Sequence, residues 1–275
     1  MKNIDSRTVY GFGREWSSFD QGEMSKHERE KIFEDYFRLF PWNLLGSEPT
    51  GADIGCGSGR WAALVAPRVG RLHLVDASSE ALAVAREKLA GLENCSFHHA
   101  SAGQLPFPDA SLDFAYSLGV LHHVPRTADA LRSVAKTLKV GAPILVYLYY
   151  AFDNRPFWFR SLWKMSDFVR RVISSLPFIL RKGMCEAIAL LIYWPIARGA
   201  WILNAVKLLP DTWPLAYYLD KSLYVMRTDA LDRFGTRLEQ RFTQVEIRNM
   251  LSQAGFVKVQ FSPKPPYWCA VAFKG

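Results

Sequence analysis

The chain has 275 residues, which is enough for one large domain or for one domain that carries a long insertion. Hydrophobic residues make up 49% and charged residues 22% of the sequence, a balance that excludes a disordered chain and supplies an ample core. The nine tryptophans and the net charge of +8 are unusual, and they leave nucleic acid, a membrane surface and an anionic ligand open as partners.

The first 45 residues are expected to form a helical lid segment. Aromatic residues alternate with glycines between Tyr10 and Phe19, and a helix that only packs against a sheet would rarely hold two glycines. We therefore favour a segment that folds over a ligand, with a helix packed on the edge of the sheet as the alternative. Residues 1–7 contain no apolar stretch typical of a signal peptide.

Residues 51–150 alternate between strand-like and helix-like patterns. Apolar runs predict strands at 52–54, 71–76, 96–100, 112–117 and 142–149. The clearest helix covers 79–90, where Leu82, Ala85 and Leu89 recur at helical spacing behind an N-cap at Ser78 or Ser79. This alternation predicts a parallel sheet covered by helices on both faces.

Residues 151–241 interrupt the alternation with a tryptophan-rich stretch of helical character, too long for a plain loop. The missing elements resume at Thr243, an N-cap that forms a capping box with Glu246, in a helix that ends at Gly255. Two strands follow at 256–261 and 268–273. The sequence therefore predicts an α/β fold: a doubly wound, seven-stranded core built from 46–150 and 242–275, with a helical cap insertion at 151–241, after strand five.

The strongest local motif runs from Asp53 to Gly59. Gly55, Gly57 and Gly59 alternate directly after a strand, where glycine lets the backbone turn sharply and approach a ligand closely. The spacing differs from the GxGxxG of dinucleotide-binding proteins, and the GK[ST] of a phosphate-binding loop is absent. Asp76 ends the next strand, where a carboxylate can accept both hydroxyls of a ribose.

The residues 53–59 resemble the first motif of the class I S-adenosylmethionine-dependent methyltransferases. Residues 105–113 (LPFPDASLD), 117–124 (SLGVLHHV) and 138–142 (LKVGA) resemble the subgroup that includes the ubiquinone and menaquinone biosynthesis methyltransferases. The resemblance implies a Rossmann-like sheet, S-adenosylmethionine as cofactor and S-adenosylhomocysteine as product. It covers about residues 50–150 and does not reach the insertion.

The resemblance also implies roles for single residues. Gly55 and Gly57 would pass beneath the methionine part of the cofactor, and Asp53 would orient the loop or hold the amino group. Asp76 would bind the ribose, with Ala77 against the adenine. Cys56 and Gly59 would complete the loop, with the Cys56 thiol chemically silent. The lid expected at the N-terminus, which the resemblance does not reach, would add Trp16 over the methyl group and Arg14 near the carboxylate.

The chain departs from the family after its third strand. Where the family usually has Gly-Asp, this sequence has Ala100-Ser101, so the adenine amino group would meet the Ser101 hydroxyl or the backbone of Ala102. Ser117 and Leu118, just beyond the fourth predicted strand, would face the sulfonium.

Candidate catalytic residues follow strands four and five. His122 and His123 lie at the mouth of the expected site, where histidine can serve as a general base for a hydroxyl acceptor. The alternative is that the pair shapes the pocket and starts a helix. Tyr149 and Asp153 are further candidates near strand five. The insertion adds three candidates that would close the pocket: Tyr224, Arg227 and Arg237.

Metal and redox chemistry are not expected. The six histidines form no metal-binding pattern, and the cysteines Cys56, Cys95, Cys185 and Cys269 lie far apart without a CxxC pair. Such cysteine usage favours a reduced, cytoplasmic location, with a membrane-peripheral position as the alternative.

The insertion carries both unusual features of the composition. Between 152 and 241 there are fourteen cations and eight anions, which is +6 of the total +8, and five of the nine tryptophans. Residues 187–206 are apolar, but Pro195 and Arg198 argue against a membrane span, because a central arginine costs about 3 kcal/mol on insertion scales. A cap over an apolar pocket is favoured, and a homodimer contact and a helix pair on a bilayer surface remain open.

The resulting hypothesis is an S-adenosylmethionine-dependent methyltransferase that acts on a small-molecule acceptor of amphipathic or acidic character. One alternative is an RNA methyltransferase whose basic insertion binds phosphates, although the sequence contains no recognisable nucleic-acid-binding module. The other is a non-catalytic binding protein that keeps the fold. The intact glycine loop and Asp76 speak against that second alternative.

Overall fold

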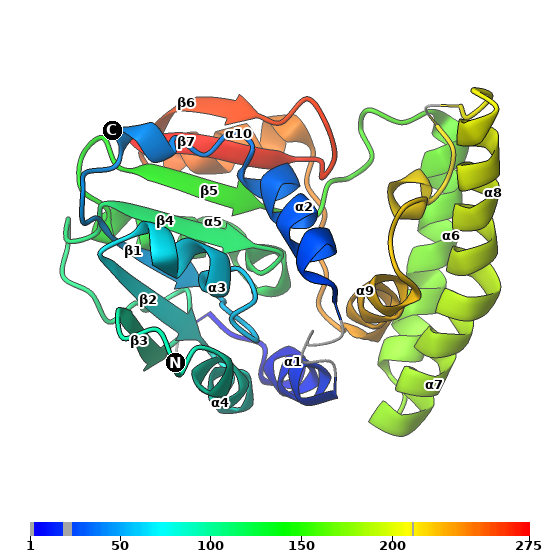
Figure 1. Cartoon of the computed structure of the whole chain (residues 1–275), viewed down its shortest axis with the longest axis horizontal. Coiled ribbons are helices and arrows are strands. Elements are labelled where there is room, and N and C mark those ends of the chain that lie inside the picture. The colour runs from blue at the N-terminus through cyan, green and yellow to red at the C-terminus, as the bar shows by residue number, and fades with distance from the viewer. Residues whose placement is uncertain (1–2, 19–23, 211) are drawn as a thin grey trace. The chain divides into compact units, whose positions relative to one another are not determined.

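The computed structural model describes residues 3–18, 24–210 and 212–275. The chain divides into two compact units, each described here by itself. The core unit contains residues Met1–Gln21, Arg29–Ala151 and Leu238–Gly275. The helical unit contains Gly22–Glu28 and Phe152–Arg237. Figure 1 shows the sheet of the core unit and the long helices of the helical unit.

The core unit is built on a seven-stranded sheet with the strand order β3-β2-β1-β4-β5-β7-β6. Strand β7 runs antiparallel to β5 and β6, and the other neighbouring strands are parallel. This confirms the predicted doubly wound sheet. The strands are β1 (Thr50–Ile54), β2 (Arg71–Asp76), β3 (Cys95–His99), β4 (Phe114–Leu118), β5 (Pro143–Tyr147), β6 (Phe256–Phe261) and β7 (Cys269–Lys274).

The helices of the sheet layers begin where the sequence places their caps. Ser78 caps α4 (Ser79–Lys88) by accepting a hydrogen bond from the Ala81 N–H, and Thr243 forms the predicted capping box of α10 (Gln244–Gln253) with Glu246. The remaining elements of these layers are α2 (Lys26–Phe37), α3 (Ala62–Val65), α5 (Thr127–Thr137) and the short turns η1 (Trp42–Leu44), η2 (Ala66–Arg68) and η3 (Leu121–His123).

The two faces of the sheet pack differently, because alternate residues of a strand point to opposite faces. On one face an aliphatic cluster joins Ala115 and Ile144 of the strands to Leu131 of α5 and Ile247 of α10. On the other face the rings of Phe114 and Tyr116 pack against Phe40 and Phe37. With both faces covered, the carboxyl-terminal edge of the parallel strands is left for a ligand.

The N-terminal segment forms helix α1 (Ser6–Ser18), which packs on α4. The expectation that its two glycines disfavour a packing helix is wrong. A Cβ atom on Gly13 would lie 2.7 Å from the Ser78 Oγ, so glycine allows α1 to approach the start of α4 closely. The cost of glycine in a helix is offset here by this close approach.

The helical unit contains three longer segments. Helix α6 (Phe157–Ser174) precedes a continuous 28-residue helix, Phe178–Ala205, which joins α7 (Phe178–Ile188), the π-helical turn η4 (Ala189–Tyr193) and α8 (Trp194–Ala205). Helix α9 (Leu223–Gly235), preceded by η5 (Ala216–Tyr218), packs on α6, α7 and η4. The π turn lies just before Pro195, which has no N–H to donate to the preceding turn. The local change in hydrogen-bond register lets the helix continue past this proline.

Candidate cofactor and acceptor site

The glycine loop leaves the end of β1 in a conformation that few other residues adopt. Gly55, Gly57 and Gly59 have φ angles of +80°, +52° and +74°. A Cβ atom on Gly55 would lie 2.3 Å from Val120, and one on Gly59 would lie 2.9 Å from Leu89. The first two glycines therefore make room at the edge of the sheet, while Gly59 permits the packing of α4.

Asp76 ties this loop to the end of β2. Its two carboxylate oxygens accept hydrogen bonds from the Gly57 N–H at 2.9 Å and from the Ser78 N–H at 2.8 Å. Burial raises the pKa of Asp76, and these backbone N–H groups counteract the rise. Ala77 follows directly, and its carbonyl oxygen lies 3.0 Å from the His99 ring. The acid thus stands beside the glycine loop, where the sequence places a ribose contact.

Asp53 is the most unusual group in the core unit. This residue is only 2% exposed, and its Oδ2 atom has no well-aligned hydrogen-bond partner among the described residues; the Tyr116 hydroxyl interacts with the carboxyl and lowers its pKa. Burial, the largest cause, raises the pKa of the Asp53 carboxyl to about 8. A buried carboxyl oxygen without a donor is costly, so it indicates a site for a ligand that brings its own N–H or cation.

Helix α1 carries Trp16 onto the glycine loop. The position of a Cβ atom on Gly57 lies 2.9 Å from Cε2 of the Trp16 ring, so the ring contacts the loop at its second glycine. On the same helix, the Phe12 ring packs 4.9 Å from the His123 ring. The Arg14 guanidinium lies 6.0 Å from the centre of the Tyr10 ring. Helix α1 therefore contacts both the glycine loop and the histidine pair.

Several predicted cofactor residues have other contacts. Ser117 and Leu118 belong to β4 rather than following it, and the Ser117 hydroxyl donates to the Ile54 carbonyl at 2.8 Å. That hydroxyl fastens β4 to β1, so the expected place just beyond the strand is wrong, while the approach of these residues to the sulfonium stays a prediction. Cys56 is buried, and burial raises the pKa of its thiol well above the usual value. Ser101 and Ala102 are buried just beyond β3, in the predicted place.

The two histidines occupy η3 and differ in their protonation. The His122 ring stacks on Tyr149 at 3.9 Å, and its Nδ1 accepts from the Tyr149 N–H at 3.4 Å. Burial lowers the pKa of His122 well below its usual value, so the ring is neutral with its proton on Nε2. His123 Nδ1 lies 2.7 Å from the Leu238 carbonyl, which can only accept, so Nδ1 carries the proton there. In this tautomer Nε2 is the acceptor nitrogen of His123, whereas in His122 the acceptor nitrogen is Nδ1, which already contacts the Tyr149 N–H.

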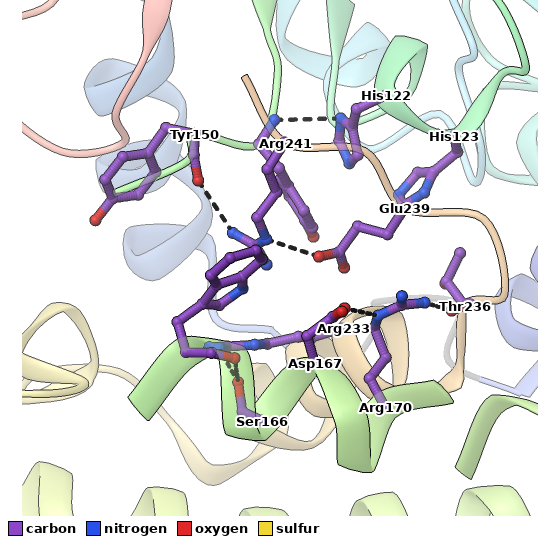
Figure 2. A network of polar contacts seen from close by, with 12 residues as sticks. His122, His123, Tyr150, Ser166, Asp167, Arg170, Arg233, Thr236, Glu239 and Arg241 are labelled. Carbon is purple, nitrogen blue, oxygen red and sulfur yellow. Dashed lines mark hydrogen bonds and ion pairs between the residues drawn. The ribbon is translucent and has the colours of Figure 1, made fainter. Parts of the chain in front are cut away.

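A buried ion pair lies beside these histidines, and sequence reasoning missed it. The Arg241 Nε donates to Glu239 Oε1 at 2.7 Å, and the side chains are only 9% and 2% exposed (Figure 2). The Arg241 guanidinium also lies 4.9 Å from the centre of the Tyr149 ring. The second carboxylate oxygen of Glu239 is buried without a hydrogen-bond partner among the described residues. This oxygen is a second acceptor that a ligand could satisfy.

No local motif marks Glu239 and Arg241, which lie near the end of the stretch assigned to the insertion. The core unit resumes at Leu238, before the expected position 242. There the backbone returns alongside the site: the Gln240 N–H donates to the His122 carbonyl, and the Phe242 N–H donates to the Tyr149 carbonyl. This pairing is long-range, so periodicity could not reveal it.

The remaining candidates belong to the helical unit. Asp153 is exposed, and Tyr224 is buried in α9. The Arg227 guanidinium donates to Glu186 at 2.9 Å, and the Arg237 carbonyl accepts from Arg170 at 3.0 Å. These contacts stabilise the helical unit itself. Within residues 3–18, 24–210 and 212–275, no group of three or more His, Cys, Asp or Glu side chains is placed to hold a metal ion.

Residues 52–146 match the family described as "Methyltransferase domain". An uncharacterized methyltransferase of Bacillus subtilis (strain 168), YcgJ, is 38% identical over 129 residues, which are 44% of this chain and 50% of that protein. The demethylmenaquinone methyltransferase of Staphylococcus aureus (strain JH9) is 33% identical over 96 residues, 34% of this chain and 40% of that protein. The chain therefore spans half or less of the curated relatives it matches.

The crystal structure of Bacillus YcgJ aligns with 86% of this chain and 70% of its own. The TM-score is 0.51 at 19% sequence identity, a likeness that concerns the fold alone. The matched family region runs from β1 into β5 and includes the glycine loop, Asp76 and the two histidines, whereas Trp16, Tyr149, Glu239 and Arg241 lie outside it.

Proposed function

We propose that this protein is a class I S-adenosylmethionine-dependent methyltransferase. It would transfer a methyl group to a small acceptor of amphipathic or acidic character. The observation that carries the proposal is the unsatisfied, buried carboxyl oxygen of Asp53 beside a glycine loop that Asp76 holds in place. An acid buried without a donor destabilises a fold unless a ligand uses it.

The residues of the site fit the cofactor. Asp53 would accept from its amino group and Asp76 from its ribose hydroxyls. Gly55 and Gly57, which lack the Cβ atoms that would meet Val120 and the Trp16 ring, would let the loop pass beneath the methionine part. The bound cofactor supplies an electrophilic methyl group on a positively charged sulfonium. A cationic amino group next to Asp53 would also lower the pKa of that carboxyl from about 8 and restore the carboxylate.

The acceptor would lie against the histidines and Tyr149. His123, whose Nδ1 proton is fixed by the Leu238 carbonyl, is our candidate for the general base, because its Nε2 is the basic nitrogen. The acceptor nitrogen of His122, Nδ1, is already occupied by the Tyr149 N–H, so His122 cannot act as the base. Its ring, stacked on Tyr149, would instead form part of the pocket surface. The protein's contribution is alignment, exclusion of water and removal of the proton.

The acceptor wall combines rings with buried charge. Phe12 and Tyr149 supply apolar surface, while Arg241 and Glu239 supply a cation and an unsatisfied acceptor oxygen. An acceptor with an aromatic or lipid-like body and one polar group matches this combination better than a nucleic acid, which needs an exposed row of cations. The similarity to a demethylmenaquinone methyltransferase supports the same class of acceptor.

Two measurements test the proposal. Calorimetry with S-adenosylmethionine and S-adenosylhomocysteine should show binding to the wild-type chain, and the absence of binding to both would refute the enzyme. Extracts incubated with the protein and methyl-labelled cofactor should yield a small molecule that gains one methyl group by mass spectrometry. Cofactor binding without any methylated product would favour the non-catalytic binding protein, and methylated RNA with salt-dependent RNA binding would favour the RNA methyltransferase.

A further inference from the structure

The helices of the helical unit expose large apolar side chains in ordered stripes. On α6, Trp158, Leu162, Met165, Val169 and Val172 recur at alternating spacings of four and three residues, and all five are exposed. We call this stripe, together with the exposed Leu180, Leu191 and Ile202 of the helix Phe178–Ala205, the apolar face. A water-facing stripe of this kind is unusual and marks an interaction site.

The side of these helices that faces the interior of the unit holds few large apolar residues. On α6 the buried Arg170 pairs with Asp167 at 2.8 Å and donates to the carbonyl of Thr236 (Figure 2), and it also donates to the carbonyl of Arg237. The other buried residues of α6 are Ile173 and Ser174. On the long helix the buried residues are Tyr193 and the small residues Cys185, Ala189, Ala197 and Ala200. These helices therefore expose more large apolar side chains than they bury, unlike a helix that covers an apolar core.

The charge around the apolar face is strongly positive. Between 157 and 205 the sequence has seven cations and two carboxylates. Both carboxylates are already paired: Asp167 with Arg170 and Arg171, and Glu186 with Arg227. Arg160 and Lys164 are also exposed on α6, so cations share the water-facing side of this helix with the stripe.

We propose that the apolar face docks on the surface of an anionic lipid bilayer, with α6 and the long helix lying in its plane. Apolar side chains would enter the boundary of the acyl chains, and the flanking cations would contact the anionic headgroups. Membrane binding by this surface does not require methyl transfer. The two proposals can therefore be tested independently of each other.

Length alone would also allow the long helix to span a bilayer. It has 28 residues, and an 18-residue window within it has a mean hydropathy of 1.3 and is 22% buried. Yet one side of this helix packs on α9, which carries Arg227, Asp229 and Arg233, and Arg198 donates to the Lys221 carbonyl. A helix that carries Arg198 and packs along one side on a helix with charged residues belongs at an interface rather than across the membrane.

The apolar face could instead bind a second copy of the chain. Two such faces brought together would bring the exposed cations Arg160 and Lys164 of one copy close to those of the other, and like charges across an interface oppose association. An anionic bilayer meets the same cations with opposite charge. Charge complementarity therefore favours the membrane.

The test is co-sedimentation of the full chain with vesicles of phosphatidylcholine, with and without phosphatidylglycerol, in the absence of cofactor. We expect binding to the anionic vesicles at low salt that weakens as salt rises. Leu162→Ser combined with Met165→Ser should reduce the bound-to-free ratio by at least about tenfold. The matched control is Leu44→Ser combined with Val245→Ser, two equally exposed apolar residues of the core unit, which should leave binding unchanged.

Several outcomes would overturn the proposal. The proposal is wrong if the wild-type chain does not bind anionic vesicles, or if the control variant loses as much vesicle binding as the Leu162/Met165 variant. Bound protein that resists alkaline extraction would indicate a membrane-spanning helix. A concentration-dependent dimer that only the Leu162/Met165 variant disrupts would assign the face to a second copy. Circular dichroism and binding of S-adenosylhomocysteine verify that each variant is folded, and a chain that binds vesicles but no cofactor would refute only the proposed function.

Discussion

The two units place their apolar residues in opposite ways. Among the described residues, eighteen of the twenty-three large apolar side chains that are exposed lie between 157 and 208. In the core unit the same residue types pack against both faces of the sheet. The polar groups of the candidate site, such as Asp53, are buried at the strand ends. One unit thus buries its large apolar side chains and the other exposes them, a difference that the overall composition conceals.

The largest expected effect tests whether the helical unit depends on its polar interior. Arg170→Ala removes a buried guanidinium that holds Asp167 and the carbonyls of Thr236 and Arg237. We expect a loss of about 3 kcal/mol in the free energy of unfolding of this unit, because a buried charge and two carbonyls lose their partner. Thermal denaturation measures the loss.

The neighbouring arginine provides the control for that experiment. The Arg171 side chain contacts the same Asp167 carboxylate but is 72% exposed, so Arg171→Ala should cost about 1 kcal/mol or less. Both variants should bind S-adenosylhomocysteine like the wild type if the two units are energetically separate. Loss of cofactor binding in Arg170→Ala would break the comparison between the units.

In the core unit the decisive substitution is Asp53→Asn. It removes the carboxylate that the cofactor's amino group would use, and we expect the affinity for S-adenosylhomocysteine to fall about hundredfold, the range of a buried charge-assisted hydrogen bond. Calorimetry measures the affinity. Asp109→Asn, at an exposed position of the same unit, should bind normally. An Asp53→Asn variant with undiminished affinity would mean that the buried acid serves the fold only.

Trp16→Ala tests whether α1 is part of the cofactor site or only a packing helix. Its ring lies against Gly57, and its removal should weaken S-adenosylhomocysteine binding about tenfold through lost apolar and aromatic contact. Tyr10→Ala, on the same helix but 61% exposed, is the matched control. If both variants bind equally well, the alternative of a simple packing helix is correct.

The strand pattern and the glycine loop could be predicted from the sequence because their signals are local. Apolar runs, caps such as Ser78 and the capping box of Thr243 occur within a few residues of each other, and the structure confirms them. Contacts over long sequence distances could not be foreseen. The Ser117 hydroxyl is bound to Ile54, 63 residues away, and the role of Gly13 depends on the approach of α4.

The same limit explains the acceptor wall and the apolar face. Glu239 and Arg241 join the site only because the chain returns alongside His122 after the helical unit. The excess of charge and tryptophan in the insertion is visible in the sequence, but a stripe of apolar residues predicts burial by default. Only the structure shows that Met165, at 69% exposure, points to solvent.

A pH dependence of stability also separates the units. The pKa of Asp53 is raised from 3.8 to about 8 by burial, so between these values the folded core holds a proton that the unfolded chain has released. Raising the pH through this window should therefore destabilise the core unit without cofactor. Asp53→Asn should remove that part of the slope, and chemical denaturation at several pH values measures the difference. S-adenosylhomocysteine should flatten the wild-type slope, since its amino group stabilises the carboxylate, whereas the stability of the helical unit should not respond to it. A slope that persists in Asp53→Asn would assign the titration to another group and remove the main electrostatic distinction between the two units.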